Sequence, residues 1–379
     1  MATPNAPRGV LRYFSTMEDP RTHQGRRHDL LDMIVIALCA VICGADGWVE
    51  IEQFGHCKLK WFRTFLTLPH GIPSHDTFGR VFARLDPEQF ERCFLNWIQS
   101  LTQGGQGRLV AIDGKTLRRS FDRAGKKAAI HMVSAWCQNN QMVLGQLATE
   151  AKSNEIQTVP KLLELLDLEG AVVTADALNC QKTIAAKTVA AQADYLLQVK
   201  GNQPALHEEL KLLFEQALRD DCQGIAYAYA EETTGGHGRL ETRRLWSTWE
   251  IDWFADRGKW KGLGSFVCLE CHRQRDGQRT VERRYYLSSL DGRDAEALLK
   301  WVRGHWSIEN QLHWSLDVSF REDDRRIRQG HAAEIYSRLC RIALNLLKAD
   351  NSVKIGIKGK RLMAGWDHDY LLKLIIQKN

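Results

Sequence analysis

Three acidic residues stand where metal-assisted phosphoryl transfer would need them. Asp113 ends the apolar run 109–112, and Asp176 ends the apolar run 172–175. Glu309 lies later in the chain, in a stretch of helical character. Two carboxylates at the carboxyl ends of strands, with a third on a later helix, can converge on two divalent cations. Metals held roughly 3.5–4 Å apart clamp the attacking and leaving oxygens of an in-line displacement. The pattern is typical of nuclease and strand-transfer chemistry.

Each of these acids also has an ordinary structural explanation. Asp is frequent in the turns that follow strands, so Asp113 and Asp176, taken singly, are compatible with turn roles. Glu309, taken singly, is compatible with polar contacts on a surface helix. His305, Glu309 and His313 share one helical face at spacings of four residues. Zinc peptidases instead place two His four residues apart with the Glu next to the first, so this is not their arrangement.

The first part of the chain is predicted to be helical. Residues 1–27 are rich in Pro, Arg and Gly and are expected to form an irregular arm. Ser74 is a candidate N-cap, and Asp86-Pro87 opens a further helix. Apolar spacing predicts helices at about 29–43 and 47–65, a short helix after Ser74 through Phe82, and a helix after Asp86 that includes Phe90 and Ile98. Residues 28–107 are therefore expected to form a helical domain that ends in the Gly-rich linker 103–107.

From residue 108 the pattern changes to alternating strands and helices. Strands are predicted near 108–112, 130–136, 142–147, 172–175 and 195–199, with helices around 159–166 and 180–191. The order of three strands, helix, strand, helix, strand is that of a ribonuclease-H-like core, which we assign to residues 108–200. In this topology the first and fourth strands are neighbours, so Asp113 and Asp176 would meet. A later helix then supplies the third acid.

A mainly β insertion is expected to interrupt the core at residues 201–292. After a helix near 207–218, alternating runs predict strands at 243–249, 265–272 and 281–287. Residues 293–350 return to the core as helices, the last of them at about 331–347. The predicted fold class is therefore α+β or α/β: a ribonuclease-H-like core with a β insertion, preceded by a helical domain. Residues 351–379 form a basic tail, since from Lys348 onward seven Lys and Arg face three acids.

Composition describes an ordinary globular protein with a basic balance. The net charge of +6 suits an anionic partner but does not prove one. No apolar run reaches the roughly 18–20 residues of a membrane span, and ten cysteines without repeated spacing argue for a reducing compartment. A cytoplasmic protein with no membrane partner is expected. Cys268, Cys271 and His272 match the spacing of a c-type haem attachment, but their strand-like setting favours a structural role.

A set of ordered motifs resembles the insertion-sequence transposases of the H-repeat-associated (ISAs) group, whose catalytic domain is of the DDE type. The resemblance covers nearly the whole chain. The motifs are Asp29-Leu-Leu-Asp-Met33, Gly44-Ala-Asp-Gly-Trp48, Ile72-Pro-Ser-His-Asp-Thr77, Ala111-Ile-Asp-Gly-Lys-Thr-Leu117, Lys152-Ser-Asn-Glu155, Asp176-Ala-Leu-Asn-Cys-Gln181, Lys200-Gly-Asn-Gln203, His305-Trp-Ser-Ile-Glu-Asn310, Leu312-His-Trp314 and Leu316-Asp-Val318.

The resemblance implies that Asp113, Asp176 and Glu309 are the catalytic acids and the ligands of Mg²⁺ or Mn²⁺. Carboxylates are the hard oxygen ligands that Mg²⁺ prefers. The related insertion-sequence signature has Arg four residues before the glutamate and Lys seven after it. Here His305 and Leu316 occupy those positions, so the helix is expected to grip phosphate differently.

Three further acids compete with Glu309 for the third position, namely Asp317, Glu322 and Asp323. Glu309 ranks above them because it has the matching motif. In addition, Asp323-Asp324 runs directly into Arg325-Arg326, which predicts a local salt-linked loop.

DNA contacts are expected from donors and an aromatic ring near the acids. The predicted contacts are Lys115, Arg118, Lys200, Asn202, Gln203, Arg303, His305 and Trp306. Trp306 is suited to stacking on a base, with a core position as the alternative. The helix 74–82, with Ser74, His75, Thr77 and Arg80 on its surface, is either a reader of the element ends or a structural or oligomerising element. No base contacts are assigned to it.

The predicted function is metal-dependent cleavage at insertion-element ends, followed by strand transfer into target DNA. The partners would be the terminal repeats and target DNA, bound by a homodimer at the nucleoid. One alternative is a catalytically silent DNA-binding protein derived from a transposase. Another is a structure-selective nuclease of the same fold. Intact acids at all three positions favour the first interpretation.

Overall fold

The computed structural model describes residues 9–22, 26–102, 107–121, 128–149, 154–236, 239–275 and 278–376. The chain divides into two compact units that interleave along the sequence. Unit 1 comprises residues 1–103, 114–154 and 309–379, and unit 2 comprises residues 104–113 and 155–308. Residues 103–106 of the predicted linker and residues 1–8 of the predicted arm lie outside the described residues. The predicted domain boundaries stay a prediction.

Unit 1 begins with five helices whose starts follow local capping chemistry. They are α1 (Leu11–Phe14), α2 (Leu30–Cys43), α3 (Trp48–Phe62), α4 (His75–Phe82) and α5 (Pro87–Leu101). Asp29, Ser74 and Asp86 each accept a backbone N–H at the start of α2, α4 and α5. Helix α2 ends at Gly44, whose φ of +117° is disfavoured for a residue with a side chain.

Two terminal segments of unit 1 differ from their predicted character. The expected irregular arm contains α1. The ring centroid of Phe14 in this helix lies 4.8 Å from that of Phe90. The expected basic tail contains α12 (Ile357–Trp366) and α13 (His368–Ile376). Lys360 and Arg361 of α12 are buried and donate to backbone carbonyls of unit 1. These cations therefore stabilise the fold and are not displayed to solvent.

The long helix α11 (Ala332–Ala349) supplies the buried charges of unit 1. Arg338 lies 2.7 Å from Glu91 of α5, and Arg341 lies 2.7 Å from Glu322, all four being buried. Asn345 of α11 donates to and accepts from the backbone of Val143. Val143 belongs to the antiparallel hairpin of β2 (His131–Cys137) and β3 (Met142–Thr149). The helix thus joins the hairpin to the N-terminal helices.

Strand β1 (Leu109–Thr116) contributes to both units, because the boundary falls after Asp113. In unit 2 the strand order is β1-β4-β5-β9-β8-β7-β6. The partners are β4 (Val172–Ala175), β5 (Asp194–Val199), β6 (Ala228–Gly236), β7 (Arg239–Thr248), β8 (Ser265–Arg275) and β9 (Gln278–Ser288). β1, β4 and β5 are parallel neighbours, whereas β9 joins β5 antiparallel. The predicted neighbourhood of the first and fourth strands is confirmed.

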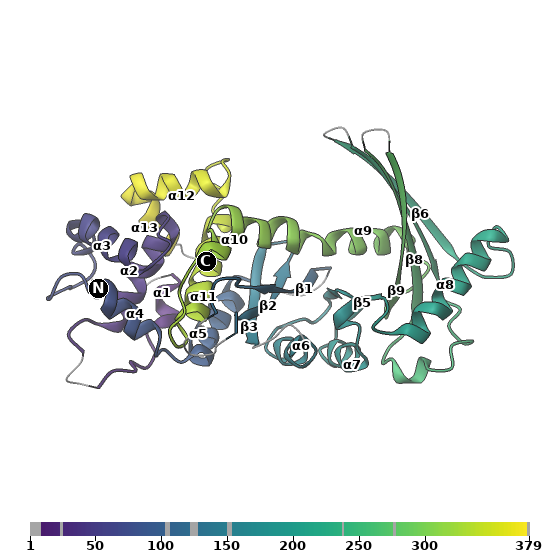
Figure 1. The fold of residues 1–379 in the computed structure, drawn as a ribbon, viewed down its shortest axis with the longest axis horizontal. Coiled ribbons are helices and arrows are strands. Elements are labelled where there is room, and N and C mark those ends of the chain that lie inside the picture. The colour runs from purple at the N-terminus through teal and green to yellow at the C-terminus, as the bar shows by residue number, and fades with distance from the viewer. Residues whose placement is uncertain are drawn as a thin grey trace. The chain divides into compact units, whose positions relative to one another are not determined.

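Helices cover both faces of the parallel strands of unit 2 (Figure 1). α6 (Glu155–Glu164) and α7 (Lys182–Ala190) lie on one face, and α9 (Ala295–His305) runs along the other. Leu298, Leu299 and Val302 of α9 join a buried apolar cluster with residues of β1, β4 and β5. α8 (Pro204–Arg219) packs against β9 through Phe214 and Tyr285, whose rings stack at 6.2 Å.

Two strands depart from prediction. β1 does not stop at residue 112 but continues through Thr116, so Asp113 lies within a strand. β6 was not predicted, because its sequence Ala-Tyr-Ala-Glu-Glu-Thr-Thr-Gly-Gly lacks alternation of apolar residues. It forms the edge of the sheet, where only one neighbour is available.

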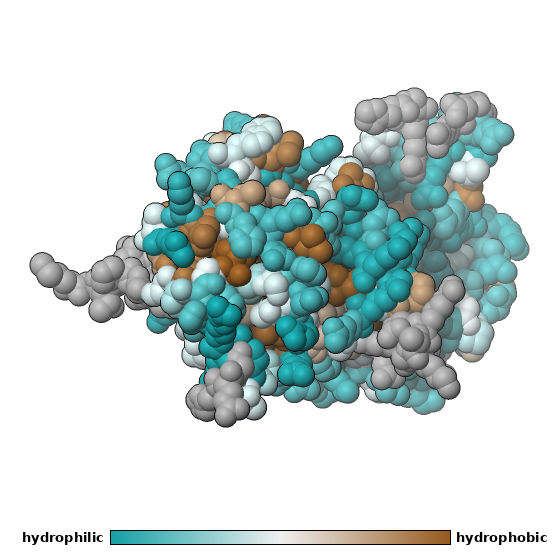
Figure 2. Space-filling model, turned by 60° about the vertical axis from the view of Figure 1, so that its left-hand side comes forward, coloured by the Kyte–Doolittle hydropathy of each residue, from teal (hydrophilic) through white to brown (hydrophobic). Residues whose placement is uncertain are grey.

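Two surface properties bear on possible partners. On the face in Figure 2, hydrophobic side chains of described residues gather in separate groups among hydrophilic ones. Within the described residues, no single helix has both the length and the apolar character to span a membrane; α2 and α3 together meet those criteria but are bent by 99°.

Candidate active site

Asp113 and Asp176 are brought together within unit 2 by the pairing of β1 with β4. The two strands are parallel, and Ile112 is in register with Ala175. Asp113 follows Ile112 within β1, and Asp176 follows Ala175 directly after the end of β4, so the backbones of the two acids lie at the same level of the sheet. That their carboxylates share a metal stays a prediction.

A tight turn after β4 fixes Asp176. Asp176 caps the 3₁₀ turn Ala177–Asn179, and its Oδ1 accepts from the backbone N of Asn179 at 3.2 Å. The Asn179 side chain, fully buried, donates to the same Oδ1 at 3.0 Å. Its Nδ2 also donates to the buried carboxylate of Glu155 at 3.0 Å. The motifs of the sequence contained Asn179 and Glu155 but gave them no role, since nothing in their spacing predicts this contact.

Cys180 follows this turn and has no access to solvent. Burial, with the negative charge of Asp176 beside it, raises the pKa of the Cys180 thiol to about 12. The thiol therefore stays protonated at neutral pH and offers no soft thiolate ligand. The polar groups that this turn presents are oxygen donors, which suit a hard divalent cation.

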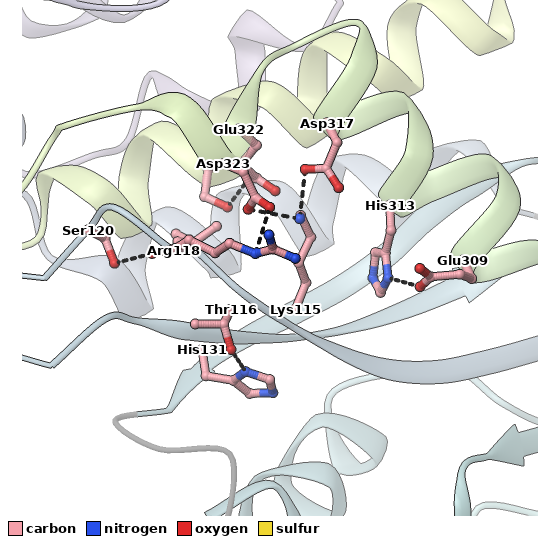
Figure 3. A network of polar contacts seen from close by, with 12 residues as sticks. Lys115, Thr116, Arg118, Ser120, His131, Glu309, His313, Asp317, Glu322 and Asp323 are labelled. Atoms are coloured by element: carbon pink, nitrogen blue, oxygen red, sulfur yellow. Dashed lines mark hydrogen bonds and ion pairs between the residues drawn. The ribbon is translucent and has the colours of Figure 1, made fainter.

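Glu309 is the first residue of unit 1 after unit 2 and lies in the π-helical segment Ile308–His313. Such segments are rare and are frequent at functional sites. Its carboxylate is 59% exposed and lies 2.8 Å from Nδ1 of buried His313 (Figure 3). The hydrogen bond from His313 holds the pKa of Glu309 below its usual value, against a smaller opposing effect of burial. His313 had no assigned role; the spacing of four residues was the available signal.

Lys115 and Arg118 were predicted to contact DNA, and both are ion-paired within unit 1 (Figure 3). Buried Lys115 lies 2.7 Å from Asp317 and 3.1 Å from Asp323, and exposed Arg118 lies 3.1 Å from Asp323. Burial opposes the charge of Lys115, but the carboxylates around it, Glu322 among them, raise its pKa overall. Lys115 is therefore a fixed cation inside the fold.

The rival acids are occupied by this network. Burial raises the pKa of Asp317, and the negative charges of Asp323 and Glu322 add to this effect. The positive charge of Lys115 opposes it but does not outweigh it. The predicted local salt link between Asp323-Asp324 and Arg325-Arg326 is wrong. Asp323 pairs instead with Lys115 and Arg118, and Asp324 with Arg321. Asp323 pairs with residues distant in sequence because β1 extends past Asp113 and carries Lys115, whereas Asp324 has a local partner other than the one predicted.

In unit 2, His305 ends α9 and lies 3.0 Å from Thr174 Oγ1 of β4, two residues before Asp176. Burial, with the nearby charge of Arg284, lowers the pKa of His305 to about 4. The ring is neutral at pH 7, so it cannot supply the positive charge of the Arg expected at its position. Any contact that it makes with DNA would be uncharged.

The other predicted DNA contacts of α9 remain accessible. Arg303 is half-exposed and pairs with Glu232. Trp306 is 42% exposed, which excludes the core alternative, and Arg284 lies 5.0 Å from its ring centroid. A base would have to share or displace this cation–π contact.

The loop after β5 contacts the turn that follows Asp176. Asn202 donates to the carbonyl of Ala177, and Gln203 Nε2 donates to the carbonyl of Cys180 at 3.0 Å. Lys200 in the same loop is exposed. Of the three predicted DNA contacts here, two have partners in the protein, and Lys200 is directed to solvent.

The predicted reader helix, α4, lines a hollow of unit 1 together with Arg326 and Arg328. His75 is engaged by Glu52, with Nδ1 lying 2.7 Å from the carboxylate, and Arg80 is exposed. Asp76 also lines the hollow, so the hollow presents both acidic and basic side chains.

Two family models match the chain. The model described as "DDE_Tnp_1-associated" matches residues 11–98, and the model described as "Transposase DDE domain" matches residues 104–346. The second alone covers more than half of the chain. Asp113, Asp176 and Glu309 all lie inside it.

Relatives match over nearly their whole length. "Putative transposase YncI" of Escherichia coli O157:H7 is 42% identical over 97% of this chain and 94% of its own. "H repeat-associated putative transposase YhhI" of Escherichia coli strain K12 is 38% identical over 97% of both chains. A piggyBac transposase in a synaptic complex with hairpin DNA aligns with 96% of this chain and 75% of its own, at 10% identity and a TM-score of 0.47. From the two family models and the two Escherichia coli relatives, the chain belongs to the DDE transposases and is a DNA transposase.

Proposed function

We propose that the protein cuts DNA at insertion-element ends and joins those ends to target DNA, with Asp113, Asp176 and Glu309 as the catalytic acids. The observation that carries the proposal is the register of Ile112 with Ala175, which puts the two aspartates side by side within unit 2. The surrounding order of strands, β1-β4-β5 parallel and flanked by helices, supports a ribonuclease-H-like core.

The chain path supports Glu309 as the third acid. His305 is bonded to Thr174 on β4, so α9 ends beside the strand that leads to Asp176. Glu309 follows only four residues later, and four helical residues advance by about 6 Å. This closeness along the chain favours Glu309 as the third acid of the proposed set. Asp317, Glu322 and Asp323 are further along the chain and have partners of their own.

The donor set fits Mg²⁺ or Mn²⁺, since all three groups are carboxylates and the adjacent thiol of Cys180 is protonated. The bound ions would activate the attacking oxygen and stabilise the leaving oxygen. The chain itself fixes the acids: β1 and β4 set the level of the aspartates, and the turn holds the Asp176 carboxylate. His313 keeps Glu309 ionised and ready to bind a cation.

DNA would approach the exposed groups near these acids. Lys200, Trp306 and Arg118 are accessible and suited to phosphate or base contacts. We expect terminal repeats and target DNA as substrates, a homodimer that pairs two ends, and action at the nucleoid in the cytoplasm. Buried Leu316 stands where the related signature has Lys, so that residue supplies no phosphate contact.

The test is cleavage of the element's own terminal repeats with Mg²⁺ by wild type and by Asp113→Ala, Asp176→Ala and Glu309→Ala. Each variant should lose activity by about a thousandfold or more, which corresponds to about 4 kcal/mol. DNA binding should persist in all of them and fall steeply with salt. Wild-type binding without nicking would instead identify a catalytically silent protein, and cutting without joining would identify a nuclease.

A further inference from the structure

We propose that Asn179 and Glu155 are positioning residues that orient the Asp176 carboxylate for metal binding, and that Asn202 and Gln203 hold the turn on which it stands. The inference rests on the proposed catalytic role of Asp176. It assigns roles to Glu155 and Asn179, which had none, and a second role to Asn202 and Gln203, which were expected at the DNA.

The first part of the arrangement is a relay through one buried amide. Asn179 Nδ2 carries two hydrogens; one reaches Asp176 Oδ1 and the other reaches Glu155 Oε2, each at 3.0 Å. The Asn179 backbone N adds a second donor to the same Oδ1 at 3.2 Å. Two donors on one oxygen prevent rotation of the carboxylate about its Cβ–Cγ bond.

Burial makes this relay specific. Glu155 is 1% exposed and Asn179 is 0% exposed, so water cannot replace either partner. A buried amide without its acceptor is destabilising, and this keeps Asn179 in the rotamer whose Nδ2 reaches both acids. Glu155 also begins α6, so the position of the acceptor is set by a helix and not by a loop.

The second part of the arrangement holds the backbone of the turn from outside. Asn202 and Gln203 donate to the carbonyls of Ala177 and Cys180, which lie at either end of the turn. Gln203 is itself fixed by a backbone bond to the carbonyl of Lys200 at 2.9 Å. The loop after β5 therefore supports the turn after β4, its neighbour in the sheet.

Groups that orient a metal ligand typically change metal affinity by 10–100-fold when removed. We therefore expect Asn179→Ala and Glu155→Leu to raise the Mn²⁺ concentration for half-maximal cleavage by that factor. The rate at saturating Mn²⁺ should stay within a few-fold of wild type. Calorimetric titration of the full chain with Mn²⁺, without DNA, should show the same loss of affinity. A purely structural defect would instead lower the amount of active protein at an unchanged Mn²⁺ requirement.

Matched variants separate orientation from folding. Glu155→Gln keeps an acceptor oxygen and should retain most of the Mn²⁺ affinity that Glu155→Leu loses. Gln181→Ala removes a side chain that donates to Leu178 within the same turn at 3.1 Å, and it should leave the Mn²⁺ requirement unchanged. Asn202 is exposed, so Asn202→Ala should not disturb folding. This variant should raise the Mn²⁺ requirement by a smaller factor without changing DNA affinity.

Asp176→Ala distinguishes the failure of this inference from failure of the proposed function. If Asp176→Ala keeps cleavage, the catalytic assignment itself is wrong. If Asp176→Ala abolishes cleavage while Asn179→Ala and Glu155→Leu keep the wild-type Mn²⁺ requirement, the positioning role is overturned. If Asn202→Ala loses DNA affinity while its Mn²⁺ requirement is unchanged, Asn202 contacts DNA and does not support the turn.

Discussion

Asp176 in unit 2 and Glu309 in unit 1 are held in opposite ways. Asp176 caps a tight turn and is bound by a buried amide and a backbone N–H, neither of which titrates. Glu309 is exposed on a π-helical segment and lies 2.8 Å from one side chain, that of His313. The comparison indicates that folding fixes the Asp176 carboxylate through buried partners, whereas the Glu309 carboxylate has greater access to solvent.

The largest expected effect is a loss of stability at low pH, caused by His305, which is hydrogen-bonded to Thr174 of β4. The pKa of His305 is about 4 in the folded protein, below the ordinary value of 6.5. Between pH 6.5 and pH 4, His305 therefore binds a proton in the unfolded chain but stays neutral in the folded chain. Stability is therefore full above pH 6.5 and declines as pH falls towards 4. From pH 7 to pH 5 the loss should be about 2 kcal/mol. Denaturant unfolding at both pH values measures it.

His305→Asn provides the control for this pH effect, because an amide can still bond Thr174 but does not titrate. The variant should lose less stability than wild type between pH 7 and pH 5. Equal losses in the two proteins would show that His305 is not the group responsible.

The second effect compares the two acids directly. Asp176→Ala leaves the buried Asn179 amide without an acceptor and should destabilise the protein by about 1–3 kcal/mol. Glu309→Ala should cost about 1 kcal/mol, because one hydrogen bond to a largely exposed carboxylate is lost. Thermal unfolding of both variants at pH 7 measures the difference. If Glu309→Ala is the more damaging change, the proposed contrast is reversed.

The third effect concerns the partner of Glu309. His313→Ala should weaken Mn²⁺ binding by about tenfold, because the carboxylate loses the group that orients it. Titration with Mn²⁺ at pH 8 gives the affinity. His305→Asn is again the matched control and should bind Mn²⁺ as wild type does. An unaltered affinity in His313→Ala would mean that Glu309 is oriented by other contacts.

The smallest expected effect is a change in the salt dependence of DNA binding, which should differ between the exposed Lys200 of unit 2 and the buried Lys115 of unit 1. Lys200→Ala should reduce the slope of log K for DNA against log salt by about 0.9, the value for one phosphate contact. Lys115→Met should leave that slope unchanged, since Lys115 is already paired with Asp317 and Asp323. A salt series of binding measurements tests both. A reduced slope in Lys115→Met would show that its ion pairs open to DNA.

Local signals predicted the strands beside the two aspartates, but not the contacts that hold these residues. A short apolar run followed by Asp sufficed to locate β1 and β4, although β1 continues past Asp113 while β4 ends just before Asp176. The caps at Ser74 and Asp86 were likewise readable, since a cap involves residues three positions apart. The motif around Glu309 identified the third acid to test, but not its π-helical backbone.

Contacts between distant residues could not be predicted from spacing. Glu155 and Asn179 are 24 residues apart, and Lys115 and Asp323 are 208 residues apart. Burial of a charge with its partner depends on the finished fold, so Lys115 and His305 resembled surface residues in the sequence. For the same reason the extension of β1 past Asp113 was missed, because the residues beyond it are polar and are covered only by later parts of the chain.

The interleaving of the two units has a consequence for fragments of the gene. The chain passes between units after residues 103, 113, 154 and 308, so no single stop codon or proteolytic cut can release either unit whole. A copy truncated anywhere between residues 114 and 308 would lose α11 and leave the buried carboxylate of Glu91 without Arg338. We expect such products to misfold and be degraded instead of persisting as competing DNA binders.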